Sequence, residues 1–330
     1  MSPKILAAFA TVALVVAACG SGDAVPAEST LPVDPSSTTV APTTTTAATT
    51  TTVPDFPLTL EMMRGTVTLD SRPERIISLS ATATESLYAI GAGDQVLAVD
   101  ESSNFPEDAP VTDLNGFTVT AESIAALEPD LVVMFFDPGD VFDGLRVLGI
   151  PTMFQTAAVD LRDAYHQIEQ LGEATGHAAE ATAYVEGMAG EIDSIVSGLP
   201  EDAPPAVFYH ELDQALYSLT SVTLIGQLYA MLGLENIADA ADPDATGYPQ
   251  LSGEYILEQD PDLIFLADTK CCRQDADTVA GRPGWDTLTA VQSGRVIELD
   301  DDVASRWGPR IVDLMIDIRA GIASLEEADA

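Results

Sequence analysis

The chain has 330 residues, of which 53 are acidic and 13 are lysine or arginine, so its formal net charge at pH 7 is −40. This charge argues against nucleic acid or an anionic membrane surface as a partner, because both would repel the protein. Solubility in a saline habitat would favour the same acidity, so the charge excludes partners without identifying one.

The N-terminus has the features of an exported lipoprotein. Lys4 precedes an apolar run over residues 5–18. This run has the length of a signal-peptide core and is shorter than the roughly 20 apolar residues that cross a bilayer. It ends in Val-Ala-Ala before Cys19, which resembles a bacterial lipobox. We predict a signal peptide over residues 1–18 and lipidation of Cys19, the alternative being a plain signal peptide and an incidental cysteine.

The next segment has the composition of a spacer. Residues 23–54 are rich in Thr, Pro, Ala and Ser, with bare threonine tracts at 43–46 and 49–52. Such a segment has almost nothing to bury and cannot offset the entropy lost on ordering. The sequence therefore predicts a lipid-anchored, disordered spacer over residues 19–55.

Beyond residue 56, short apolar runs alternate with helical patterns. Residues 75–79, 95–99 and 131–136 are apolar runs of strand length, and residues 84–90 have helical spacing. Strands that alternate with helices form βαβ units, whose strands are parallel. The sequence therefore predicts an α/β protein with mainly parallel sheets and flanking helices.

An internal repeat divides this region. Residues 120–133 and 252–265 share a hydroxyl residue, a glutamate two positions later, matching apolar positions, a Pro-Asp pair and a following apolar run. A weaker echo relates residues 86–91 to residues 227–233. We therefore predict two similar lobes.

A helical region separates the two halves. Residues 177–196 place apolar side chains at helical spacings, as one face of a long amphipathic helix requires, and breaks are expected near Gly172 and Gly176. We predict an N-terminal lobe over residues 56–160, a helical region over residues 161–200 with a linking helix over residues 177–197, and a C-terminal lobe over residues 201–330.

Together these features resemble the helix-linked periplasmic binding proteins for vitamin B12, ferric siderophores and haem, over residues 67–318. The motifs that carry the resemblance are the run at 75–79 with the Thr-Glu pair that ends at Glu85, the two segments in which a glutamate is followed after six residues by Pro-Asp, and Arg-Trp-Gly-Pro-Arg at 306–310. The resemblance implies two lobes joined by one long rigid helix, with a ligand in the cleft between them. It also implies a receptor that delivers a corrinoid or ferric siderophore to a dimeric ABC permease with its ATPase.

The two repeated glutamates are candidate docking residues. Glu122 and Glu254 each follow a capping hydroxyl, so each is expected in a first helical turn, where its charge stabilises the helix without any further role. The resemblance implies that they dock, one per lobe, onto arginines of the paired permease subunits. Equal acidic groups on two similar lobes suit a two-fold symmetric partner.

The resemblance also carries a set of ligand-binding positions. Aromatic side chains from both lobes pack on the ligand in the B12-binding members, and polar groups fix its orientation. The matching residues in this chain are Phe135, Tyr217, Tyr248, Asp302 and Arg306, with Trp307 as a stacking neighbour. For each aromatic residue, ordinary core packing is the alternative. For Arg306 the alternative is a salt bridge with one of the many acids.

Two positions depart from that pattern. Ser102 stands where the B12-binding protein has a tyrosine, and Gly116 stands where it has a tryptophan, although Phe117 is adjacent and is expected to fill the same space. The sequence therefore predicts a similar cleft whose ligand is a corrinoid or a ferric siderophore, with a metal-ion or haem receptor of the same architecture as the alternative.

Catalytic and metal-binding patterns are weak. The chain lacks a Gly-x-Ser-x-Gly elbow and has three histidines, two in helical polar surroundings and His210 at a strand end, where it could face the cleft. The adjacent Cys271 and Cys272 are compatible with a vicinal disulfide, two buried thiols or a soft-metal site. We predict a monomeric receptor without enzyme activity, metal or cofactor, held outside the cell membrane by its N-terminal lipid alone.

Overall fold

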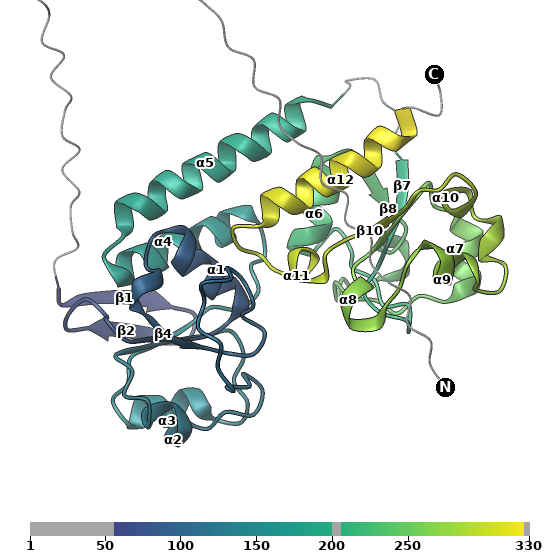
Figure 1. Cartoon of the computed structure of the whole chain (residues 1–330). Coiled ribbons are helices and arrows are strands. Elements are labelled where there is room, and N and C mark those ends of the chain that lie inside the picture. The colour runs from purple at the N-terminus through teal and green to yellow at the C-terminus, as the bar shows by residue number, and fades with distance from the viewer. Residues whose placement is uncertain (1–55, 200–205, 327–330) are drawn as a thin grey trace, which may run out of the picture. The chain divides into compact units, whose positions relative to one another are not determined.

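The structure is a computed structural model, which describes residues 56–199 and 206–326. The predicted signal peptide, Cys19 and the predicted spacer lie outside the described residues. Two four-stranded sheets, both parallel, form the framework (Figure 1). The predicted α/β class with two similar sheets is therefore confirmed.

Each sheet has the same order of strands. In the N-terminal lobe the order is β4-β3-β5-β6, with β3 at Ile76–Leu79, β4 at Val96–Val99, β5 at Leu131–Met134 and β6 at Thr152–Phe154. In the C-terminal lobe it is β8-β7-β9-β10, with β7 at Ala206–Glu211, β8 at Leu234–Asn236, β9 at Leu263–Leu266 and β10 at Val296–Glu298. The central strands β5 and β9 are buried along their whole length, as expected of parallel strands covered on both faces.

An antiparallel hairpin precedes the first sheet and was not part of the sequence prediction. Its strands are β1 (Leu58–Met62) and β2 (Gly65–Leu69). Leu60, Val67 and Leu69 point from it into the main core. Arg64, in the turn of the hairpin, pairs with Asp137 at 2.6 Å, so the hairpin packs on the N-terminal lobe.

Helices connect the strands. In the N-terminal lobe they are α1 (Ala81–Ala89), α2 (Ala121–Ala125) and α3 (Val141–Val147), and the helical region contains α4 (Leu161–Thr175) and α5 (Ala178–Ser197). The C-terminal lobe contains α6 (Leu224–Met231), α7 (Gly253–Gln259), α8 (Thr269–Cys272), α9 (Ala276–Ala280), α10 (Thr289–Gln292), α11 (Asp301–Ala304) and α12 (Ile311–Glu326). Short 3-10 turns lie at Gly93–Gln95, Asp239–Ala241 and Trp285–Thr287. Within the described residues, no helix is both long enough and apolar enough to cross a membrane.

The sequence repeat is also a repeat of structure. The aspartate of each Pro-Asp pair ties the start of one strand to its neighbour: the Asp130 carboxylate accepts from the Arg75 amide at 2.8 Å, and the Asp262 carboxylate accepts from the Val207 amide at 2.9 Å. Both aspartates therefore fix the register of the central strand pair in their own lobe.

The predicted linking helix is present as the 20-residue α5, drawn in teal in Figure 1. The expected break at Gly176 is confirmed, since this residue ends α4 with a φ of 78°. The expected break at Gly172 is wrong, because α4 continues through it. A Cβ there would lie 2.3 Å from the Cβ of Ala181 in α5, so glycine allows the two helices to pack closely.

One core cluster runs through both lobes. It joins Ile76 of β3 to Met188 and Ile192 of α5, Leu314 of α12 and Phe208 of β7. One further cluster packs against each sheet, around Val132 of β5 in the N-terminal lobe and around Ile264 of β9 in the C-terminal lobe. Because α5 contributes to a shared core, it is a packed structural element and not an exposed tether. Within the described residues, the buried members of these three clusters all lie at residue 60 or later.

Candidate ligand-binding site

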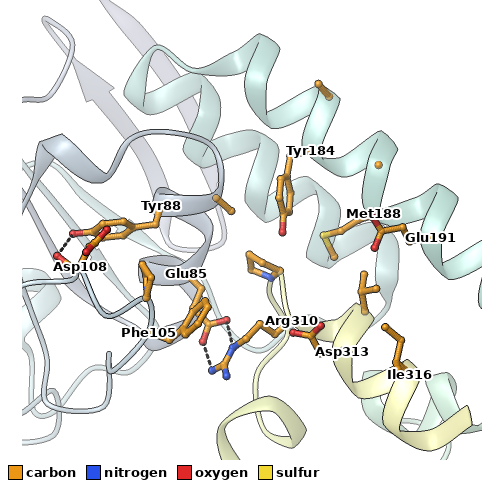
Figure 2. A pocket seen from close by; sticks show the side chains of 16 residues that line it. Glu85, Tyr88, Phe105, Asp108, Tyr184, Met188, Glu191, Arg310, Asp313 and Ile316 are labelled. Atoms are coloured by element: carbon orange, nitrogen blue, oxygen red, sulfur yellow. Dashed lines mark hydrogen bonds and ion pairs between the residues drawn. The ribbon is translucent and has the colours of Figure 1, made fainter. Parts of the chain in front are cut away.

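A buried ion-pair network joins α1 to the segment between α11 and α12. Glu85 of α1 is almost fully buried and accepts from Arg306 Nη1 at 2.5 Å. The same carboxylate receives Arg310 through Nη2 at 2.7 Å and Nε at 3.0 Å, as Figure 2 shows. Two guanidinium groups offset the cost of burying one carboxylate, since charge-assisted hydrogen bonds satisfy its oxygens.

Arg306 uses its other terminal nitrogen inside the protein as well. Nη2 donates to the Ser102 carbonyl at 2.8 Å, to Asn104 Oδ1 at 2.9 Å and to Asp302 Oδ1 at 2.9 Å. The side chain is only 7% exposed. The salt-bridge alternative for Arg306 is therefore present in the structure, and its direct contact with a ligand stays a prediction.

Asp302 is held from three sides. Its Oδ2 accepts from Lys270 Nζ at 2.9 Å and from Asn104 Nδ2 at 3.0 Å, in addition to the contact with Arg306. Burial would raise the pKa of Asp302, but the hydrogen bonds from Lys270 and Asn104 and the charge of Arg306 lower that pKa below its ordinary value. Asp302 is thus an ionised link between the lobes.

A cavity of about 230 Å³ lies beside this network. It contains five of the seven predicted ligand residues. Its lining consists of Ser80, Ala81, Thr82, Ser102, Phe117, Phe135, Asp302, Ser305, Arg306 and Trp307. The cavity therefore brings N-terminal-lobe aromatics together with the Arg-Trp motif of the C-terminal part.

Aromatic rings form one side of this cavity and continue outside it. The ring of Phe135 lies 6.3 Å from Phe117 and 6.1 Å from Trp307, both edge-on. Phe136, which sequence reasoning missed, lies 5.3 Å from Phe117 and is also exposed. The sequence does carry a signal for Phe136, because it is the second of two phenylalanines that directly follow a buried strand. The four residues Phe117, Phe135, Phe136 and Trp307 are called the aromatic cluster below.

The two departures from the resemblance have structural reasons. A Cβ on Gly116 would lie 2.9 Å from the Asp100 carboxylate, so a side chain there would have to displace this carboxylate. Phe117 is 57% exposed and extends into the cluster instead. Ser102 donates to the same Asp100 carboxylate at 2.8 Å while its carbonyl receives Arg306.

Tyr217 and Tyr248 lie on two paired backbone segments of the C-terminal lobe. Tyr217 is 40% exposed and Tyr248 is 54% exposed, and the backbone of Tyr217 pairs with Gln250 in an antiparallel bridge. Neither tyrosine lines the 230 Å³ cavity. Their contact with a ligand therefore stays a prediction.

A larger cavity, of about 720 Å³, is lined in part by Glu85 and Arg310 of the ion-pair network (Figure 2). Tyr184 reaches into it from α5, and the acidic residues Asp108, Glu191 and Asp313 line it. Arg310 is the basic residue in its lining, and Glu85 already holds that side chain. The cavity contains none of the predicted ligand residues, and its charge disfavours an anionic ligand.

Glu122 and Glu254 occupy the predicted places. Both are exposed second residues of their helices, α2 and α7. The caps are as expected, since the Thr120 side chain accepts from the Ser123 amide and the Ser252 side chain accepts from the Tyr255 amide in the first turn of α7. The helical positions are confirmed, while the docking role stays a prediction.

The C-terminal lobe holds a second buried ionic group. Glu211 pairs with Arg282 through two hydrogen bonds of 2.6 and 2.5 Å, and Asp268 lies fully buried near them. Burial and the neighbouring Glu211 raise the pKa of Asp268 to about 7.

His210 is also buried and bonds to the Tyr229 hydroxyl at 2.9 Å, so it does not face the cleft.

Comparisons with known proteins agree with this fold. A family model described as periplasmic binding protein matches residues 76–303. A cobalamin-binding protein of Halobacterium salinarum is 32% identical over 276 residues, covering 79% of this chain and 72% of the relative. YvrC of Bacillus subtilis, an uncharacterized ABC transporter substrate-binding lipoprotein, is 28% identical over 268 residues, covering 78% of this chain and 83% of the relative. The crystal structure of the vitamin B12 binding protein BtuF of Vibrio cholerae matches with a TM-score of 0.64 and 26% identity, over 76% of this chain and 97% of the other.

Two parallel sheets that share a core with a long packed helix, with a polar and aromatic cavity beside the segment between α11 and α12, form the architecture of a two-lobed binding protein. More specifically, the chain belongs to the periplasmic binding protein family.

Proposed function

We propose that this protein binds a macrocycle of the corrinoid class and delivers it to an ABC permease. The observation that carries the proposal is the aromatic cluster. Three of its rings line the 230 Å³ cavity, and two of its phenylalanines are exposed. Exposed flat rings give a large contact area at low entropic cost, and the hydroxyls in the cavity suit the polar edge of such a ligand.

The cavity holds only part of such a ligand, since complete small-molecule sites measure about 300–1,000 Å³. We therefore place the rest of the macrocycle over the exposed faces of Phe117 and Phe136. Tyr217 and Tyr248 contribute from the C-terminal lobe. A cobalamin-binding relative supports this choice of ligand over a ferric siderophore or haem.

Delivery needs a docking surface and a location. Glu122 and Glu254 present one exposed carboxylate per lobe at matched helical positions, which suits arginines of a two-fold symmetric permease. Lipidation of Cys19 and the spacer up to residue 55 would keep the receptor at the outer face of the cell membrane. Tethering of this kind raises the effective concentration at the permease.

The test is a ligand titration of residues 56–330 in which binding is measured by thermal shift and by tryptophan fluorescence. The probes are cyanocobalamin, cobinamide, haem, several ferric siderophores and zinc. A bound ligand must raise the melting temperature by mass action. A saturable shift with a corrinoid supports the proposal. A rise in melting temperature with only an iron chelate or haem would mean that the ligand is of that class and not a corrinoid. A rise with zinc alone would contradict the proposal that the protein binds a macrocycle.

Matched variants identify the cavity that binds the ligand. Phe135→Ala removes a ring from the smaller cavity, and we expect a corrinoid to bind at least about tenfold more weakly, as for other aromatic contact residues. Phe105→Ala removes an exposed ring from the larger cavity and is expected to leave affinity unchanged. The opposite pattern would place the ligand in the larger cavity.

A further inference from the structure

The adjacent cysteines, which the proposed function does not use, are joined in a disulfide. Cys271 and Cys272 form this bond at the end of α8, with Cys271 exposed and Cys272 half-buried. The helix has only four residues, and a single helical turn is not stable by itself. Its conformation therefore depends on the disulfide ring and on contacts with its surroundings.

Those contacts come from three consecutive acids. The Asp301 carboxylate accepts from the Lys270 amide at 3.0 Å and from the Cys271 amide at 2.8 Å, and so caps the start of the turn. The Lys270 ammonium pairs with Asp300 at 2.5 Å and with Asp302 at 2.9 Å. The turn that carries the disulfide is thus fastened to the first residues of α11.

One of these three acids, Asp302, also contacts the N-terminal lobe. Asp302 receives the Asn104 amide at 3.0 Å and pairs with Arg306 at 2.9 Å, and Arg306 in turn pairs with Glu85. The contacts Lys270–Asp302–Asn104 therefore connect the residue next to the disulfide with the opposite lobe. We call these three residues the latch.

We propose that Cys271–Cys272 is a redox-sensitive site for an external dithiol, and that its reduction loosens the latch and speeds release of the ligand from the cleft. The second part rests on the proposed function. In the oxidised state the ring fixes the peptide between the two cysteines, which holds Lys270 at Asp302. In the reduced state the turn is free to unwind, and Asp302 loses one of its three partners.

The exchange step is balanced. A thiolate of the dithiol attacks the Sγ of the exposed Cys271, the bond between the cysteines breaks, and Cys272 leaves as a thiolate that takes up a proton. The second thiolate of the reductant then attacks the mixed disulfide and releases Cys271. Two electrons pass from the dithiol to the cysteine pair, and the reductant ends as a cyclic disulfide.

The first test needs no ligand. Residues 56–330 are compared before and after treatment with dithiothreitol by hydrogen–deuterium exchange, and the thiols are counted by alkylation and mass spectrometry. We expect no alkylation before reduction and two alkylated cysteines after it. We also expect the amides of Lys270 and Cys271, and those around Asn104, to exchange at least about fivefold faster, the low end of measured coupling between sites. Alkylation without reductant, or equal exchange in both states, overturns the proposal.

The second test uses dissociation of bound cyanocobalamin in a stopped-flow chase. Reduction should raise the rate constant at least about fivefold, and the Cys271→Ser/Cys272→Ser variant should dissociate at the faster rate with or without reductant. Lys270→Met keeps the disulfide but removes the contact with Asp302, so its rate should no longer respond to reduction. An unchanged rate in the reduced wild type rejects the coupling to the cleft. Failure to bind cyanocobalamin counts against the proposed function alone, because the exchange measurement still decides the redox response.

Discussion

Replacing Glu85 by glutamine should strongly destabilise the protein. The change keeps the shape of the side chain but removes the charge that pairs with Arg306 at 2.5 Å and with Arg310 at 2.7 Å. Arg306 is 7% exposed and would keep Asp302 as its remaining charged partner. Breaking a buried ion pair from one side costs about 3–5 kcal/mol, because an uncompensated charge is left inside. We expect a loss of about 3 kcal/mol, since the glutamine oxygen still accepts one hydrogen bond.

The measurement is urea unfolding of residues 56–330 followed by circular dichroism, with the free energy of unfolding taken from linear extrapolation. The matched control is Asp160→Asn, which removes a pair whose Arg162 partner is 90% exposed. Exposed pairs of this kind contribute about 0–1 kcal/mol. If Glu85→Gln lowers stability no more than this control does, the reasoning that the network carries interlobe stability is refuted.

Three further predictions concern the packing of α4 on α5, the ionisation of Asp268 and the two exposed glutamates. Gly172→Ala should lower the free energy of unfolding by about 1–3 kcal/mol, because the added methyl group overlaps α5. The control is Gly187→Ala, which has open space around it and should be neutral or stabilising. Equal effects of the two variants in urea unfolding would contradict the packing argument. The raised pKa of Asp268 means that the folded state binds a proton more tightly than the unfolded state, so stability should fall by on the order of 3 kcal/mol as pH rises from about 4 to about 7. Asp268→Asn should flatten that slope, and an unchanged slope would assign it to other groups. Glu122→Ala with Glu254→Ala should abolish uptake of the ligand by cells while leaving its affinity for the isolated protein intact, and wild-type uptake would reject docking.

Local patterns were sufficient to predict the parts of the fold that depend on few neighbours. The repeat around the two Pro-Asp pairs predicted both central strands, because an aspartate that caps a strand start acts through backbone contacts close to it. The same patterns placed Glu122 and Glu254 in first helical turns, since a hydroxyl two residues earlier is a short-range cap. The length of α5 followed from its apolar spacing alone.

Features that depend on contacts distant in sequence could not be predicted in this way. Gly172 read as a helix break because glycine has low helix propensity, yet α5 requires the absence of a side chain there. The role of Arg306 depends on Glu85, which precedes it by more than two hundred residues and carries no sign in the sequence that it is buried. Asn104, the third residue of the latch, belongs to no recognisable sequence motif, so its contact with Asp302 could not be predicted.

The network also limits how the protein can select its ligand. A shared core passes through α5, and a buried ion pair joins Glu85 of one lobe to Arg306 next to the other. Opening the lobes widely would expose apolar surface and separate these charges, and each buried pair broken in this way costs several kcal/mol. Wide opening of the lobes is therefore a costly means of discrimination. Under the proposed function, selection rests on surfaces that are already present, and the exposed rings of Phe117 and Phe136 are the candidates. We expect their substitution to change ligand preference more than stability.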